Sequence, residues 1–144
     1  MKSKPLEILV VEDNPGDIRL LSDFMKRSKV PNNVHAVENG AQALDYLRKT
    51  GKYSNALMPH LIILDLNMPI KGGREVLSEV KEDPNLKHIP IIVLTTSDAP
   101  LDINNSYHLH ANCYLTKPSD LDEFYHMVSA IEEFWMTMAK LPRR

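Results

Sequence analysis

The stretch His60–Pro69, HLIILDLNMP, decides the fold that we expect for this chain. Its four apolar residues, Leu61 to Leu64, run without a break into one acid, Asp65. A short continuous apolar run is typical of a strand buried on both faces, as in a parallel sheet covered by helices. Asp65 then ends that strand at the sheet edge where open α/β folds bind ligands. We therefore expect Asp65 to be the working residue.

Apolar runs and helical periodicities alternate along the rest of the chain. The expected strands are residues 6–11, 34–37, 61–64, 89–94 and 111–115. The expected helices are residues 17–28, a helix capped by Asn39, residues 74–81, 99–109, and a last helix from Leu121 to Met138 that follows a capping box of Ser119 and Asp122. This order predicts one α/β domain over residues 1–144, with right-handed crossovers and helices on both faces of a parallel sheet.

Composition narrows the class of protein. The formal net charge is −2 and 25% of residues are charged, which does not indicate the basic patch of a nucleic-acid-binding domain. No run approaches the ~18 apolar residues of a membrane span. The single cysteine, Cys113, cannot form an internal disulfide and suits a reducing compartment. We expect a cytoplasmic protein that binds neither nucleic acid nor membranes.

Polar side chains follow four of the expected strands. Glu12 and Asp13 come after the first strand, Asp65 after the third, Thr95 after the fourth and Lys117 after the fifth. Each has a common structural explanation when taken alone, such as a solvated cap, but their shared position is a specific signal. Crowded carboxylates repel one another unless protons or a divalent cation intervene, and an oxygen-only site suits Mg²⁺. With a flanking hydroxyl and ammonium, this set of groups suits phosphoryl transfer to a carboxylate.

Four segments carry a resemblance to a known family: Leu9–Asp13 (LVVED), Ile63–Pro69 (ILDLNMP), Val93–Thr95 (VLT) and Tyr114–Pro118 (YLTKP). With them, the chain resembles the response-regulator receiver domains of two-component signalling, the family of the chemotaxis response regulator, over residues 6–138. The resemblance implies a flavodoxin-like, doubly wound sheet of five parallel strands in the order 2-1-3-4-5 with five helices. It also implies a single receiver domain without an output domain.

The resemblance assigns roles to the site residues. It makes Asp65 the phosphoacceptor, and it implies a Mg²⁺ site formed by Glu12, Asp13, Asp65 and the backbone carbonyl of Asn67. Lys117 would pair with the acceptor or its phosphate, through a cis bond to Pro118. Thr95 would be the switch hydroxyl and Tyr114 the switch aromatic residue.

Three positions depart from the family pattern. The segment Ile70–Gly73 lacks the usual Asp before Gly, Thr96 replaces a common Ala or Gly, and His110 replaces a common Gly. We expect the bulkier Thr96 to narrow access to the phosphate. Histidine can adopt the left-handed conformation, although less readily than glycine. None of these changes removes a catalytic group.

The loop 50–59, the segment Met68–Leu77 and the long last helix resemble stand-alone response regulators partnered with bacterial phytochromes. A sensor histidine kinase, with a phytochrome as the candidate, would then supply the phosphoryl group. The protein would not be an enzyme beyond assisting its own phosphorylation and dephosphorylation. Phosphorylation would switch the face made by helix 99–109, strand 111–115 and the last helix for partner binding or homodimerisation, with Tyr125, Met127 and Phe134 as candidate surface residues.

Other functions fit the sequence less well. A pseudo-receiver that docks proteins without accepting phosphate is the main alternative, although the complete set of acids, Thr95 and Lys117 argues against it. A dehalogenase-type phosphatase needs a second acid two residues after the nucleophile, where this chain has Asn67. A flavin mononucleotide carrier needs a phosphate cradle, but the turn after the first strand is acidic.

Overall fold

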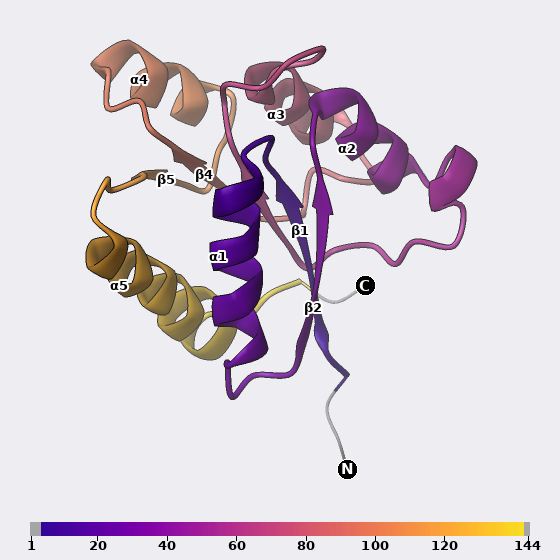
Figure 1. Cartoon of the computed structure of the whole chain (residues 1–144). Coiled ribbons are helices and arrows are strands. Elements are labelled where there is room, and N and C mark those ends of the chain that lie inside the picture. Colours follow the sequence, from indigo (N-terminus) through magenta and orange to yellow (C-terminus); the bar gives the residue numbers. More distant parts are fainter. Residues whose placement is uncertain (1–3, 143–144) are drawn as a thin grey trace.

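The computed structural model describes residues 4–142, and these residues contain one sheet of five parallel strands (Figure 1). The strands are β1 (Leu6–Val11), β2 (Asn32–Val37), β3 (Leu61–Leu64), β4 (Ile91–Thr95) and β5 (Cys113–Thr116). Their order is β2-β1-β3-β4-β5, which confirms the predicted doubly wound, flavodoxin-like topology. Val11 of β1 pairs with Leu64 of β3, so these two central strands end side by side.

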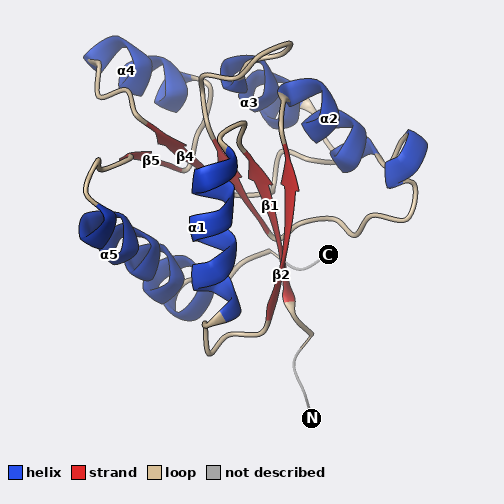
Figure 2. Cartoon of the chain, viewed as in Figure 1, coloured by secondary structure: helices blue, strands red, loops and turns tan. Residues whose placement is uncertain are grey.

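Helices cover both faces of the sheet (Figure 2). One face carries α1 (Pro15–Lys26) and α5 (Leu121–Ile131), and the other carries α2 (Gly40–Arg48), α3 (Gly73–Glu82) and α4 (Pro100–His108). Strand β1 shows how the two cores form. Ile8 and Val10 pack with α1 and α5, whereas Leu9 and Val11 pack with α2 and α3. Alternate side chains of the strand thus enter opposite cores, and both are apolar.

Several boundaries differ from those predicted. Helix α1 begins at Pro15, two residues early, because the Asn14 side chain accepts a hydrogen bond from the Asp17 N–H and Pro15 suits the first turn. Strand β2 begins at Asn32, also two residues early. The 50–59 loop contains a short 3₁₀-helix, η1 (Gly51–Tyr53).

Two local predictions at the C-terminal third of the chain are wrong. The N-cap of α5 is Asp120, whose side chain accepts from the Glu123 N–H, so Ser119 and Asp122 do not form the capping box. The described residues contain no cis peptide bond, so the Lys117–Pro118 bond is trans.

The last helix continues beyond α5 as a π-helical segment, η2 (Glu132–Met138). No helix within residues 4–142 has the length and apolar character needed to span a bilayer.

Candidate metal and phosphorylation site

Three carboxylates converge where β1 and β3 end. Glu12 and Asp13 follow β1, and Asp65 follows β3 with its N–H donating to the Val11 carbonyl at 3.0 Å. One oxygen from each of the three side chains lies within 4.8 Å of the others. Glu12 and Asp65 are buried, at 3% and 7% exposure, while Asp13 is exposed. The sheet therefore brings together the three acids that the sequence predicted as metal ligands.

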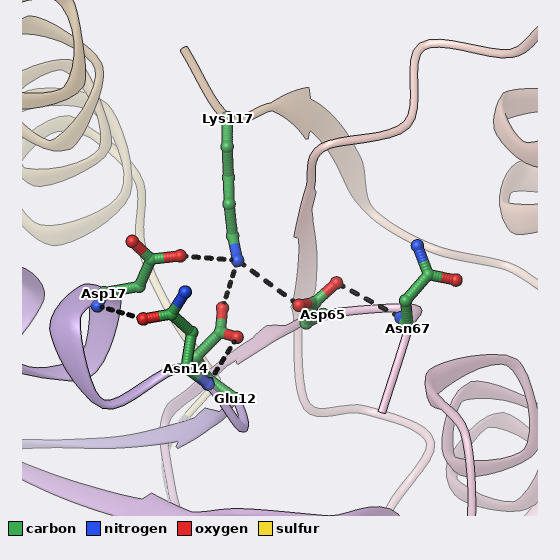
Figure 3. Close-up of polar contacts among 6 residues, drawn as sticks. All are labelled: Glu12, Asn14, Asp17, Asp65, Asn67 and Lys117. Carbon is green, nitrogen blue, oxygen red and sulfur yellow. Dashed lines mark hydrogen bonds and ion pairs between the residues drawn. The ribbon is translucent and has the colours of Figure 1, made fainter. Parts of the chain in front are cut away.

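Lys117 extends from the loop after β5 into this cluster (Figure 3). Its Nζ lies 2.5 Å from Glu12 Oε1, 2.9 Å from Asp17 Oδ2 and 3.2 Å from Asp65 Oδ2. Its backbone N–H donates to the Thr95 carbonyl at 2.6 Å, which holds the loop against the end of β4. The structure thus places Lys117 beside Asp65, as predicted, but with three acidic partners.

Asp17 is the site residue that the sequence did not indicate. It lies in the first turn of α1, where the Asn14 side chain accepts from its N–H at 3.1 Å. The Asn14 N–H also donates to Glu12 Oε2 at 3.2 Å, so the same turn fixes both acids. An acid in the first turn of a helix is common because it complements the helix dipole. Because the helix dipole alone explains an acid at this position, the local sequence does not indicate that Asp17 contacts Lys117, which lies 100 residues further along the chain.

The backbone around Asp65 leaves no room for a side chain at Gly73. A Cβ atom there would lie 2.1 Å from the Asp65 carbonyl oxygen and 2.7 Å from the Leu66 Cα. The Gly73 N–H donates to the Leu66 carbonyl at 3.0 Å, so the start of α3 packs directly on the acceptor segment. The Asn67 N–H donates to Asp65 Oδ1 at 3.2 Å and orients that carboxylate. The role of the Asn67 carbonyl as a metal ligand stays a prediction.

Thr95 is the last residue of β4, and Tyr114 lies in the neighbouring strand β5. Thr95 is fully buried, and its hydroxyl has no hydrogen-bond partner within residues 4–142. Since buried polar groups are nearly always paired, an unpaired hydroxyl is a group available to a ligand. The Tyr114 hydroxyl donates to the Ser97 carbonyl at 2.8 Å, and its ring is half-buried against the α2–α3 core.

The crowding of charges changes two pKa values. Burial, reinforced by the charge of Asp65, raises the pKa of Glu12 to about 7, although the hydrogen bond from Lys117 opposes this. Burial alone would lower the pKa of Lys117, but its hydrogen bonds to Glu12 and Asp17 outweigh burial and raise it. These surroundings favour the charged form of Lys117, whereas they favour the protonated form of Glu12.

The residues that depart from the family pattern have these conformations and exposures in the structure. His110 has a φ of 72°, the left-handed conformation expected of it. Ile70 has a φ of 67° and is 83% exposed, an uncommon combination for a β-branched residue. Thr96 is exposed.

The surface predicted for partner binding needs one correction. Tyr125 is half-buried and stacks on Phe24 with ring centroids 6.2 Å apart, and Met127 packs against the α1–α5 core. Only Phe134 of the three candidate residues is exposed. The large exposed apolar residues of α4 and α5 are instead Leu101, Tyr107 and Leu121.

A doubly wound sheet with an acid cluster, a buried hydroxyl and a lysine at its carboxyl edge defines a class of signalling domain. Residues 8–129 match the response regulator receiver domain family, and the chain belongs to it. It is 46% identical over 138 residues to response regulator Rcp1 of Synechocystis sp., covering 96% of this chain and 94% of that protein. It is 36% identical to the probable methanogenesis regulatory protein FilR2 of Methanothrix harundinacea, covering 96% and 88%.

Solved structures agree with this assignment. The phosphorylated cyanobacterial phytochrome response regulator RcpA superposes with a TM-score of 0.94 at 50% identity, covering 97% of this chain and 100% of that one. The Mn²⁺-bound form of Rcp1 gives a TM-score of 0.94 at 45% identity, covering 96% and 100%. The chain is thus a response regulator receiver domain related to phytochrome response regulators, with an acidic pocket of the kind that binds divalent metals.

Proposed function

We propose that this protein is a phosphorylation switch that accepts a phosphoryl group from a histidine kinase on Asp65. One observation carries the proposal. The buried Asp65 carboxylate lies at the end of β3, within 4.8 Å of two further acids and 3.2 Å from the Lys117 ammonium. In this arrangement the Lys117 ammonium can stabilise the charge of a phosphoryl group directly, and the two acids can do so through a bound cation.

The acid cluster fits a magnesium ion. Its ligands are oxygen atoms only, and four carboxylates (Glu12, Asp13, Asp17 and Asp65) share the site with Lys117. Glu12, Asp13, Asp65 and the Asn67 carbonyl would hold Mg²⁺, which would neutralise charge on the phosphoryl oxygens.

The chemistry that we propose for the side chains is a single displacement. An Asp65 carboxylate oxygen attacks the phosphorus of a phosphohistidine, so an O–P bond forms while the P–N bond breaks and the imidazole leaves. Lys117, already beside Asp65, donates to one phosphoryl oxygen. The Thr95 hydroxyl donates to another, which satisfies a buried donor that has no partner among residues 4–142 before the reaction.

This new partner for Thr95 provides the switch. When Thr95 moves toward the phosphoryl group, the β4–α4 loop follows, and Tyr114 gives up its hydrogen bond to the Ser97 carbonyl and turns inward. Phosphorylation then shifts the population of molecules toward this second conformation, which changes the surface formed by α4, β5 and α5. The exposed Leu101, Tyr107 and Leu121 on this face would contact a partner protein or a second copy of this chain.

The proposed upstream partner is a sensor histidine kinase, with a phytochrome as the candidate because the structural relative RcpA is a cyanobacterial phytochrome response regulator. Such a regulator would act in the cytoplasm and would need neither nucleic acid nor a membrane. Its only chemistry would be its own phosphorylation and dephosphorylation.

Intact mass spectrometry after incubation with acetyl phosphate and Mg²⁺ tests the proposal. We expect one phosphoryl adduct on the wild type, none on Asp65→Asn, and none on the wild type when EDTA removes the metal. Size-exclusion chromatography of the same samples then reports whether phosphorylation drives dimerisation. An unmodified wild type that also fails to bind beryllofluoride would support a phosphate-independent docking module instead.

A further inference from the structure

The Lys117 ammonium is shared among three carboxylates before any phosphoryl group arrives. Its three N–H donors match three acceptors, at 2.5 Å on Glu12, 2.9 Å on Asp17 and 3.2 Å on Asp65. The contact with the proposed acceptor is the longest of the three. Lys117 therefore has no spare donor, and a phosphoryl oxygen must take one that a carboxylate already holds.

Asp17 differs from the other two partners in position. Its side chain is 23% exposed, against 4% for Glu12 and 9% for Asp65, so it holds Lys117 from the solvent side of the site. It is also absent from the group of acids whose oxygens lie close enough together to bind one cation. Asp17 thus adds a negative charge to the site without the compensation that metal binding gives to the other acids.

We infer that Asp17 is a positioning residue that competes with the phosphoryl group for Lys117, an inference that rests on the proposed function. Because Asp17 draws the ammonium toward solvent, it limits how completely Lys117 can serve a phosphoryl oxygen on Asp65. Glu12 still holds Lys117 when Asp17 is neutralised, so the lysine stays in the site.

The variant Asp17→Asn tests this competition, with beryllofluoride as the phosphoryl mimic. We expect the affinity for beryllofluoride, measured by titration at saturating Mg²⁺, to rise about fivefold, a change within the range of single ion pairs. The affinity for Mg²⁺ alone should change less than twofold, because Asp17 is not among the metal ligands. A role limited to holding the fold together would not separate these two affinities.

Two further variants make the test specific. Asp122→Asn is the matched control, because Asp122 is also an acid in the first turn of a helix, α5, and it is exposed. This variant should leave the beryllofluoride affinity unchanged. In a Lys117→Gln background, Asp17→Asn should change that affinity less than twofold, because the competition acts through Lys117.

The outcomes separate this inference from the proposed function. A wild type that does not bind beryllofluoride would contradict the proposed function itself. A wild type that binds it, with an Asp17→Asn variant of equal or lower affinity, would overturn only the role of Asp17. A fivefold gain that persists in Lys117→Gln would also overturn it, since the effect would then be one of charge alone.

Discussion

Strand β1 places two glutamates in buried positions, one near its start and one just after its end, and their surroundings differ. Glu7 is 2% exposed and Glu12 is 3% exposed. The oxygens of Glu7 accept from Asn33 Nδ2 at 2.8 Å and contact His35 Nε2 at 3.0 Å, so each has its own partner on or beside β2. Glu12 instead shares one lysine with Asp17 and Asp65.

The difference shows that burial of an acid does not by itself identify a functional site. Glu7 is individually satisfied by Asn33, which the β1–β2 register places opposite it, and by His35, two residues further along β2, and this suits a structural role. Glu12 lies among more carboxylates than the nearby cation can neutralise, and its pKa is raised to about 7. Crowding without enough positive charge supports our proposal that the carboxyl edge of the sheet binds a metal ion and a phosphoryl group.

The largest effect is expected from a substitution that displaces the acidic edge itself. Gly73→Ala would force a Cβ against the Asp65 carbonyl, so we expect it to destabilise folding by roughly 3 kcal/mol. Gly72→Ala is the matched control, because its nearest atom would lie at an ordinary 3.5 Å. Urea denaturation measures both, and equal stabilities would contradict the close packing of α3 on Asp65.

Glu12→Gln should remove a metal ligand and lower the affinity for Mg²⁺ by about tenfold or more. Glu7→Gln carries the same chemical change at the other end of β1 and should leave that affinity unaltered. Isothermal titration calorimetry of the two variants tests the contrast. Similar losses in both would show that Mg²⁺ binding responds to any buried charge on this strand.

The stability of Glu7→Gln is expected to fall by about 1–2 kcal/mol. A glutamine offers only one oxygen where each oxygen of Glu7 has a partner, so its amide nitrogen can pair with His35 only after the imidazole changes tautomer to accept. Thermal unfolding followed by circular dichroism measures the loss. We expect His35→Ala and Asn33→Ala each to lower the free energy of unfolding in the wild type, but to have little further effect when Glu7→Gln is already present. Equal losses in the two backgrounds would show that neither residue acts through the Glu7 carboxylate.

The smallest effect concerns pH. The pKa of Glu12 is raised to about 7 in the folded state, whereas the ordinary pKa of a glutamate is 4.5. Between these values the folded state binds more protons than the unfolded state, so this group's stabilisation is lost as pH rises. We expect the metal-free wild type to lose on the order of 1 kcal/mol relative to Glu12→Gln between pH 4.5 and pH 7.5. Urea denaturation in EDTA measures the free energy of unfolding of both proteins across this pH range. An equal change in the two proteins would contradict the raised pKa of Glu12.

Much of the site could be predicted because its residues follow strands directly. The apolar run Leu61–Leu64 placed Asp65 at a sheet edge, and the parallel order of strands brought Glu12, Asp13 and Lys117 to the same edge. A strand end is a local feature, and its meeting with other strand ends follows from the topology.

The missing parts depend on contacts between distant elements. Asp17 meets Lys117 only when α1 packs beside the loop after β5, and the need for glycine at position 73 arises from the approach of α3 to Asp65. Helical periodicity also could not show that Tyr125 is covered by Phe24 of α1. Ser119 and Asp120 are both suitable N-cap residues, and the path of the chain rather than its composition selects Asp120.

The identity of the modified residue is the most direct test of the account. After phosphorylation with acetyl phosphate and Mg²⁺, borohydride reduces an aspartyl phosphate to homoserine with loss of phosphate, and peptide mass spectrometry locates the changed residue. The account predicts homoserine at position 65 alone, and none when EDTA is present. Homoserine at position 13 or 17, or an adduct that survives in Asp65→Asn, would contradict the assignment of Asp65 as the acceptor.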